Sequence, residues 1–197
     1  MRKVCALSCS ARKNGNCVSA LSYAAELIRK RGFEAELLHM SDFEIKPCTK
    51  CSMECYFEKP CPNPDESEKL LKLLEAADGV IVASPVYNGG APAQLRCFLE
   101  RLPFPYDEVL QGKATGAVVV GSLGVVNAAT TLASWLAPGK LFVGWVELDP
   151  RATTARNPKL RGAWLKGNLM ENEHNRKQVE KLVSMLLNAL ERLEPST

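Results

Sequence analysis

Short apolar runs alternate with segments of helical periodicity along most of this chain, and that alternation restricts its fold more than any other feature. The predicted strands cover residues 4–8, 34–39, 79–84, 114–120 and 141–148. The predicted helices lie between and after them, at residues 18–30, 67–77, 93–102, 128–136 and 179–193. Strands that alternate with helices predict a parallel sheet with helices on both faces.

The order of these elements predicts one α/β domain over residues 1–197. Five parallel strands suit the order 2-1-3-4-5 of a flavodoxin-like three-layer sandwich. Ligands of such sheets bind beyond the carboxyl ends of the strands, next to the point where the strand order reverses. The loops after the first, third and fourth strands are therefore the candidate binding loops. Two segments fall outside the pattern, a cysteine-rich loop at about 45–65 and an irregular arm at about 149–168.

Charge and hydropathy argue against several classes of partner. Lysine and arginine total 25 and aspartate and glutamate total 22, so the net charge of +3 is too small to predict a nucleic-acid or membrane-surface partner. No apolar run approaches the ~20 residues that a membrane-spanning helix needs. The first apolar stretch ends at Ser8, too soon for the core of a signal peptide. We therefore expect a cytoplasmic protein with no nucleic-acid and no membrane partner.

The loop after the first strand, Ser10–Asn16, opens the first predicted helix. Backbone N–H groups at a helix N-terminus carry partial positive charge and bind anions. Ser10 and Asn16 can add hydrogen bonds there, and Arg12 can add charge. The loop is neither a Walker A motif nor a Gly-x-Gly-x-x-Gly pattern, so it predicts a bound monophosphate rather than a nucleoside triphosphate. The alternative is a solvated turn with an asparagine cap.

The loop after the third strand, Ser84–Pro92, is more elaborate than a simple strand-to-helix connection requires. Its prolines fix the backbone and its glycines allow close approach, so its peptide groups can hydrogen-bond a planar heterocycle. Tyr87 offers a ring for stacking. The alternative is a plain connection whose tyrosine belongs to the core.

Four of the eight cysteines fall within one short segment, with the spacing Cys48-x2-Cys51-x3-Cys55-x5-Cys61. Four thiolates close together hold a [4Fe–4S] cluster, and they also make a structural zinc site. Zinc sites usually show two separate Cys-x2-Cys pairs, and this segment has one such pair. Disulfides or free thiols are the third interpretation, although a chain of this length with no export signal does not need disulfides. The pattern favours the iron–sulfur cluster.

Three motifs together carry a resemblance to a known family. They are the Ser10–Asn16 loop, the run Ser84-Pro85-Val86-Tyr87, and the pattern Gln94-Leu95-x-x-Phe98. The combination resembles the NADPH-dependent FMN reductase superfamily. With the cysteine cluster between these motifs, the chain is similar to the iron–sulfur flavoproteins of that superfamily. The resemblance covers roughly residues 2–125, and beyond them it is one of topology.

The resemblance implies positions for an FMN cofactor. The phosphate would lie against Ser10, Arg12, Asn14, Asn16 and Cys17. The isoalloxazine would lie against Pro85, Val86, Tyr87, Asn88 and Gly89, with Gly121, Ser122 and Gly124 on its far side. The chain departs from the family in having Cys17 where threonine or serine is usual, and a second cysteine gap of three residues where two are common. The loop after the fourth strand also lacks the expected extra glycines.

The resemblance implies a function in electron transfer. The cluster would carry one electron at a time and the flavin one or two, so we assign no acid–base catalyst. The donor would be ferredoxin or NAD(P)H, the acceptor a small molecule, and the assembly a homodimer or homotetramer. Two alternatives stay open: a cluster-free NAD(P)H-dependent FMN or quinone reductase, and a non-catalytic redox carrier or sensor.

Overall fold

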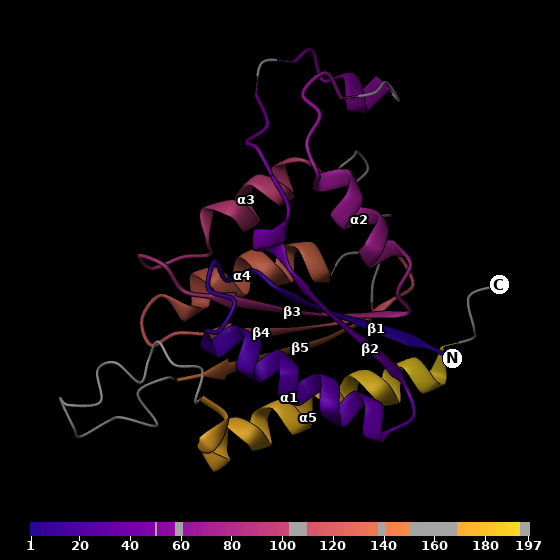
Figure 1. The fold of residues 1–197 in the computed structure, drawn as a ribbon, viewed down its shortest axis with the longest axis vertical. Helices are drawn as coiled ribbons and strands as arrows, with labels where there is room; N and C mark the ends of the chain where they lie inside the picture. The colour runs from indigo at the N-terminus through magenta and orange to yellow at the C-terminus, as the bar shows by residue number, and fades with distance from the viewer. Residues whose placement is uncertain (50, 58–60, 103–109, 138–140, 150–168, 194–197) are drawn as a thin grey trace.

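The fold is an α/β sandwich, seen in a computed structural model that describes residues 1–49, 51–57, 61–102, 110–137, 141–149 and 169–193 (Figure 1). The strands are β1 (Lys3–Ser8), β2 (Glu34–His39), β3 (Gly79–Pro85), β4 (Ala114–Val120) and β5 (Leu141–Leu148). The helices are α1 (Asn16–Lys30), α2 (Ser67–Glu75), α3 (Ala93–Glu100), α4 (Val125–Leu136) and α5 (Glu173–Arg192). Short 3₁₀ turns occupy Met40–Asp42, Glu54–Phe57 and Leu169–Glu171.

The sheet has the order β2-β1-β3-β4-β5, and every neighbouring pair of strands is parallel. This confirms the predicted fold class and strand order. Val4 of β1 lies opposite Ala35 of β2 on one side and Gly79 of β3 on the other. The chain therefore changes direction across the sheet at β1, and the loops that follow β1 and β3 open a crevice at the carboxyl edge.

Two helical layers cover the sheet, with α1 and α5 on one face and α2, α3 and α4 on the other (Figure 1). Helix α5 packs very close to the strands because β4 has a glycine beneath it: a Cβ on Gly116 would lie 3.2 Å from Cδ1 of Leu182. On the opposite face, the rings of Phe98 and Trp135 meet edge to face with centroids 5.7 Å apart. Within the described residues, no helix combines the length and apolar character that crossing a bilayer requires.

Some element boundaries differ from the prediction for local physical reasons. Strand β3 runs one residue further, through Pro85, which pairs with Val120 at the end of β4. Helix α4 begins three residues earlier, at Val125, because Gly124 takes a left-handed φ of 72° and turns the chain into the helix directly. Of the arm predicted at 149–168, only Asp149 belongs to the described residues.

The cysteine-rich loop projects beyond the layer of α2, α3 and α4 on two arms (Figure 1). We call residues 43–49 the outgoing arm and residues 61–66 the returning arm. Backbone and side-chain hydrogen bonds join the arms: Glu66 N donates to Glu44 O at 2.9 Å, and Asn63 Nδ2 donates to Thr49 O at 2.6 Å. Gln94 of α3 fixes the base of the outgoing arm, since its amide donates to the carbonyls of Met40 and Phe43 at 2.9 and 3.1 Å.

Candidate functional site

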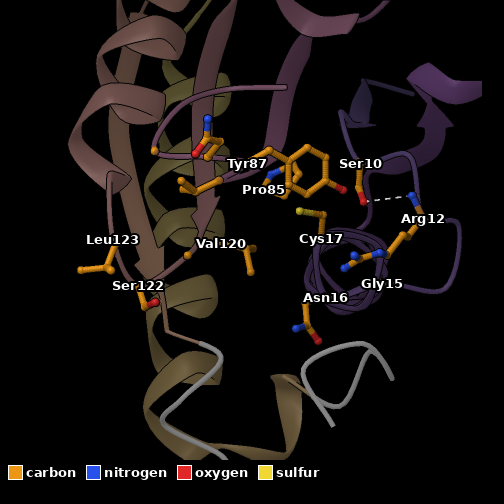
Figure 2. Close-up of a pocket in the computed structure, with 14 residues that line it drawn as sticks. Ser10, Arg12, Gly15, Asn16, Cys17, Pro85, Tyr87, Val120, Ser122 and Leu123 are labelled. Carbon is orange, nitrogen blue, oxygen red and sulfur yellow. Dashed lines mark hydrogen bonds between the residues drawn. The ribbon is translucent and has the colours of Figure 1, made fainter. Parts of the chain in front are cut away.

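The loops after β1, β3 and β4 enclose a cavity of about 450 Å³ at the carboxyl edge of the sheet (Figure 2). This volume lies in the range of small-molecule and cofactor sites. The lining residues come from these three loops, the first turn of α1 and the ends of β3 and β4: Ser10, Arg12, Gly15, Asn16, Cys17, Pro85, Val86, Tyr87, Asn88, Gly89, Val120, Gly121, Ser122 and Leu123.

Most of the residues expected to bind the cofactor line this one cavity, and two do not. Asn14 is exposed and lies outside the lining, and Gly124 lies behind it. Gly15 and Leu123, which belong to the predicted loops but were not predicted as individual contacts, also line it, as does Val120 at the end of β4. The signal for Val120 was available, because the last residue of a parallel strand lies at the same edge as the loop that follows it.

The α1 end of the cavity is built for an anion. Gly15 is the N-cap of α1 and makes no side-chain cap hydrogen bond, and the backbone N–H groups of a first helical turn point beyond the helix end. The first turn has no acidic residue. Ser10 Oγ accepts a hydrogen bond from Arg12 N at 3.1 Å, which shapes the loop around the helix end (Figure 2). Such N–H groups beside the Arg12 guanidinium are suited to a phosphate.

The opposite wall is a tight hairpin after β3. Tyr87 and Gly90 exchange two backbone hydrogen bonds, at 2.9 and 3.1 Å, around the two-residue turn Asn88-Gly89. Both turn residues have positive φ, 46° and 78°, as in the type I′ turns that favour Asn-Gly. The turn directs the ring of Tyr87 across the cavity toward Ser10 and Cys17 (Figure 2). Tyr87 is 36% exposed, so its ring is available to a ligand.

Close glycine contacts hold the β3 and β4 loops together. A Cβ on Gly121 would lie 2.5 Å from Cγ2 of Val86, and one on Gly124 would lie 2.5 Å from the Cα of Gly89. Asn127 Nδ2 adds a hydrogen bond of 2.9 Å to Gly89 O. Gly124 therefore positions the wall that contains Gly89 instead of lining the cavity itself.

Cys17 contributes a neutral sulfur to the phosphate end. The side chain is buried, and burial raises the pKa of its thiol to about 12. Burial also raises the pKa of neighbouring Cys9 well above the ordinary value. At neutral pH both thiols stay protonated, so Cys17 adds no negative charge that would repel an anion.

The four clustered cysteines occupy the projecting loop, and none of them lines the cavity. All four are exposed and free of disulfides. The thiols of Cys48 and Cys51 lie within hydrogen-bond reach of each other. The pKa of Cys48 is raised, mainly by burial and to a smaller extent by Cys51. Among the described side chains, no three His, Cys, Asp or Glu groups are gathered around one metal position. The four free thiols fit an iron–sulfur cluster in number and chemistry, and the loop holds them more openly than a bound cluster requires.

A buried ion pair lies at the foot of the returning arm. Arg101 follows the last turn of α3, and its Nε lies 3.3 Å from Oδ2 of Asp65. Their side chains are only 4% and 1% exposed. Burial alone would raise the pKa of Asp65, but hydrogen bonds from Ser67 and the Lys46 amide, together with the charge of Arg101, lower it below its ordinary value.

Comparison with known proteins agrees with this geometry. The model of the family described as NADPH-dependent FMN reductase matches residues 2–147. An iron-sulfur flavoprotein of Methanocaldococcus jannaschii is 39% identical over 121 residues, which are 61% of this chain and 62% of that protein. An iron-sulfur flavoprotein of Methanosarcina thermophila is 37% identical over 99 residues, which are 50% and 51% of the two chains. The matched segments thus span about half to three fifths of the length of these relatives.

Two solved structures with the same fold are named as a reductase and an oxidoreductase. A flavone reductase superposes with a TM-score of 0.70 at 14% identity, covering 99% of this chain and 65% of its own. FerB, an NAD(P)H:(acceptor) oxidoreductase of Paracoccus denitrificans, gives 0.60 at 17% identity, with 96% and 99% covered. At such identities these two likenesses support the fold alone. The family match covers most of the chain and includes all three loops of the cavity, and on that ground the chain belongs to the NADPH-dependent FMN reductase family.

Proposed function

We propose that this chain is an FMN-binding oxidoreductase that carries a [4Fe–4S] cluster on Cys48, Cys51, Cys55 and Cys61. It transfers electrons between ferredoxin or NAD(P)H and a small acceptor, as a homodimer or homotetramer in the cytoplasm. The observation that carries the proposal is the cavity at the carboxyl edge, with a helix N-terminus at one end and a peptide-rich hairpin at the other. A phosphorylated, planar molecule such as FMN needs both features.

Each part of the cavity has a role in holding FMN. Arg12 and the first turn of α1 bind the phosphate, with Ser10 and Asn16 beside them. The hairpin Tyr87–Gly90 offers backbone groups and an aromatic ring to the isoalloxazine. Gly121 and Ser122 approach its far side. When bound, FMN supplies one- or two-electron chemistry and the cluster one-electron chemistry; the protein binds and orients both.

The separation of the two sites supports an oligomer. Among the described residues, the lining of the cavity comes from the β1, β3 and β4 loops, α1 and the strand ends, while the cysteines lie on a loop that projects past α2, α3 and α4 (Figure 1). A second copy of the chain can bring its cysteine loop to the cavity of the first. In this proposal the electrons pass between subunits. Thiolate ligands persist in a reducing compartment, which is why the proposal includes the cytoplasm.

The test is an anaerobic preparation in which FMN, iron and acid-labile sulfide are quantified per chain, with an ultraviolet–visible spectrum. One FMN with about four irons and four sulfides per chain supports the proposal. A preparation with neither flavin nor iron contradicts it.

One observation favours a second candidate, a cluster-free NAD(P)H-dependent FMN or quinone reductase. Among the described residues, the cysteine thiols are not gathered at one metal position. Flavin without iron in the same preparation would select this candidate. Steady turnover with NAD(P)H and a quinone would then separate a reductase from a non-catalytic carrier or sensor.

A further inference from the structure

Arg101 is a buried cation at the foot of the cysteine loop, and its hydrogen bonds and ion pair hold it in one orientation. Its Nε pairs with Asp65 at 3.3 Å, and its Nη2 donates to the carbonyl of Asn63 in the returning arm. Asp65 is held in turn by the amides of Lys46 and Ser67, both at 2.9 Å. The guanidinium is therefore fixed between α3 and both arms of the loop.

One of the clustered cysteines, Cys61, lies beside this guanidinium. The Cys61 thiol donates to Asn63 O at 3.7 Å, the same carbonyl that accepts from Arg101 Nη2. Cys48 is on the outgoing arm and Cys61 on the returning arm, and the ion pair of Arg101 touches both arms: Asp65 accepts from the amide of Lys46, and Asn63 O accepts from Arg101 Nη2.

One nitrogen of the guanidinium, Nη1, is buried and makes no hydrogen bond to the described residues. A buried N–H of a charged group without an acceptor is unfavourable, and such groups in folded proteins usually mark a missing ligand or ion. Sulfur atoms of a cluster and its thiolates are acceptors of this kind of hydrogen bond.

We propose that Arg101 is a positioning residue for the iron–sulfur cluster, placing a fixed positive charge and the buried Nη1 donor beside the sulfur of Cys61. This inference rests on the proposed function. A cluster held by four thiolates is an anion, and reduction adds one more negative charge. A buried cation beside it stabilises the reduced form more than the oxidised form, so Arg101 raises the midpoint potential.

The experiment compares wild type with Arg101→Met, Arg101→Lys and Asp65→Asn after anaerobic reconstitution. Arg96→Met is the matched control, because Arg96 is an exposed arginine of the same helix. Iron, sulfide and FMN are quantified per chain, and the cluster potential is measured by a redox titration followed by electron paramagnetic resonance. Circular dichroism of each variant reports whether the fold is intact.

We expect Arg101→Met to lower the midpoint potential, with FMN content unchanged and Arg101→Lys closer to wild type. Asp65→Asn breaks the same ion pair but removes a negative charge, so its potential does not fall. Loss of iron from Arg101→Met alone, with native circular dichroism and full FMN, also supports the proposal.

An unchanged potential in Arg101→Met overturns the proposal. So does an equal fall in Arg101→Met and Asp65→Asn, or loss of iron from both, because each result means that Arg101 acts only by holding the arms. Wild type with FMN and no iron instead overturns the proposed function, and this inference with it.

Discussion

Asn127, in the first turn of α4, donates a hydrogen bond from Nδ2 to the carbonyl of Gly89 at 2.9 Å, and so fastens the hairpin after β3 to the loop after β4. The two loops also meet through the close contacts of Gly121 with Val86 and of Gly124 with Gly89. We predict that Asn127→Ala weakens FMN binding about five-fold, the equivalent of one neutral hydrogen bond of about 1 kcal/mol. Flavin fluorescence titration of the apoprotein measures this. Thr130→Ala on the same helix is the control, since Thr130 bonds only to its own helix; equal weakening in both variants would contradict the prediction.

Arg12 gives the α1 end of the cavity, where we propose that the phosphate binds, its charged side chain. Arg12→Ala is expected to weaken FMN binding at least about tenfold, because hydrogen bonds to charged groups are stronger than neutral ones. Lys13→Ala is the matched control: Lys13 is in the same loop, pairs with Asp42 and does not line the cavity. Dialysis followed by flavin quantification measures retention. Full retention of FMN by the Arg12 variant would show that the phosphate lies elsewhere.

Cys55 is the proposed ligand whose position the longer gap affects most directly. We expect Cys55→Ser to remove the cluster and leave FMN in place, because none of the cavity lining comes from the cysteine loop. Cys97→Ser on α3 is the control, since Cys97 lies outside the motif. Iron and flavin analysis of anaerobic protein measures both cofactors. Unchanged iron in Cys55→Ser would show that Cys55 is not a ligand.

Burial divides the cysteines of the apoprotein into two reactivity classes. Only the thiolate reacts with iodoacetamide, and burial raises the pKa of Cys17 to about 12. Cys17 and Cys9 are therefore expected to stay unmodified between pH 7 and about pH 9, while the exposed Cys51, Cys55 and Cys61 are alkylated. Mass spectrometry of the digested protein at each pH measures the labelling. Alkylation of Cys17 as fast as Cys61 would contradict its burial.

Asp65 gives the apoprotein a pH-dependent stability. Its pKa is lowered in the folded chain, so its contribution is complete above the unfolded value of about 3.9 and is lost as pH falls through the lower folded value. Asp65→Asn is expected to reduce the free energy of unfolding by about 3 kcal/mol at pH 7, because it leaves Arg101 buried without its partner. Urea unfolding at a series of pH values should show that the difference in free energy of unfolding between wild type and Asp65→Asn becomes smaller below about pH 4.

The exposed pair of Glu68 and Lys72 on α2 supplies the control for this experiment. Glu68→Gln should change the free energy of unfolding by less than about 0.5 kcal/mol, as exposed pairs usually do. A constant difference between wild type and Asp65→Asn down to pH 3 would mean that the carboxylate is not the source of the effect.

The fold was predictable from the sequence because each strand and helix has a local hydrophobic pattern that identifies it. The alternation of apolar runs with helical faces determined the order of elements, and the order of elements determined the sheet. The pairing of Pro85 with Val120 could not be predicted from these local patterns. Whether the end of one strand lies beside the end of another depends on register, which the pairing of whole strands decides.

Candidate residues were predictable as loops but not as individual contacts. Asn14 and Gly15 are neighbours, yet only Gly15 faces the cavity, because the backbone of the Ser10–Asn16 loop folds back on Arg12. Arg101 and Asp65 had no sequence signal at all, since they are far apart in the chain and meet only after α3 packs against the returning arm. Contacts between distant segments are set by packing, which a single sequence does not display.

Because the two arms of the cysteine loop are joined by hydrogen bonds, an inserted residue in the loop has only a small effect on the free energy of closing it. Glu44 and Glu66 close the loop at its base, so the chain between Cys48 and Cys61 already has its ends together before any ligand binds. The entropic cost of closing a loop grows only with the logarithm of its length, and doubling the length costs about 0.6 kcal/mol. One extra residue between Cys51 and Cys55 therefore adds far less than that to the free energy of closing the loop. We therefore expect that the segment between the two arms can change in length and sequence while the sheet and the cavity keep their structure.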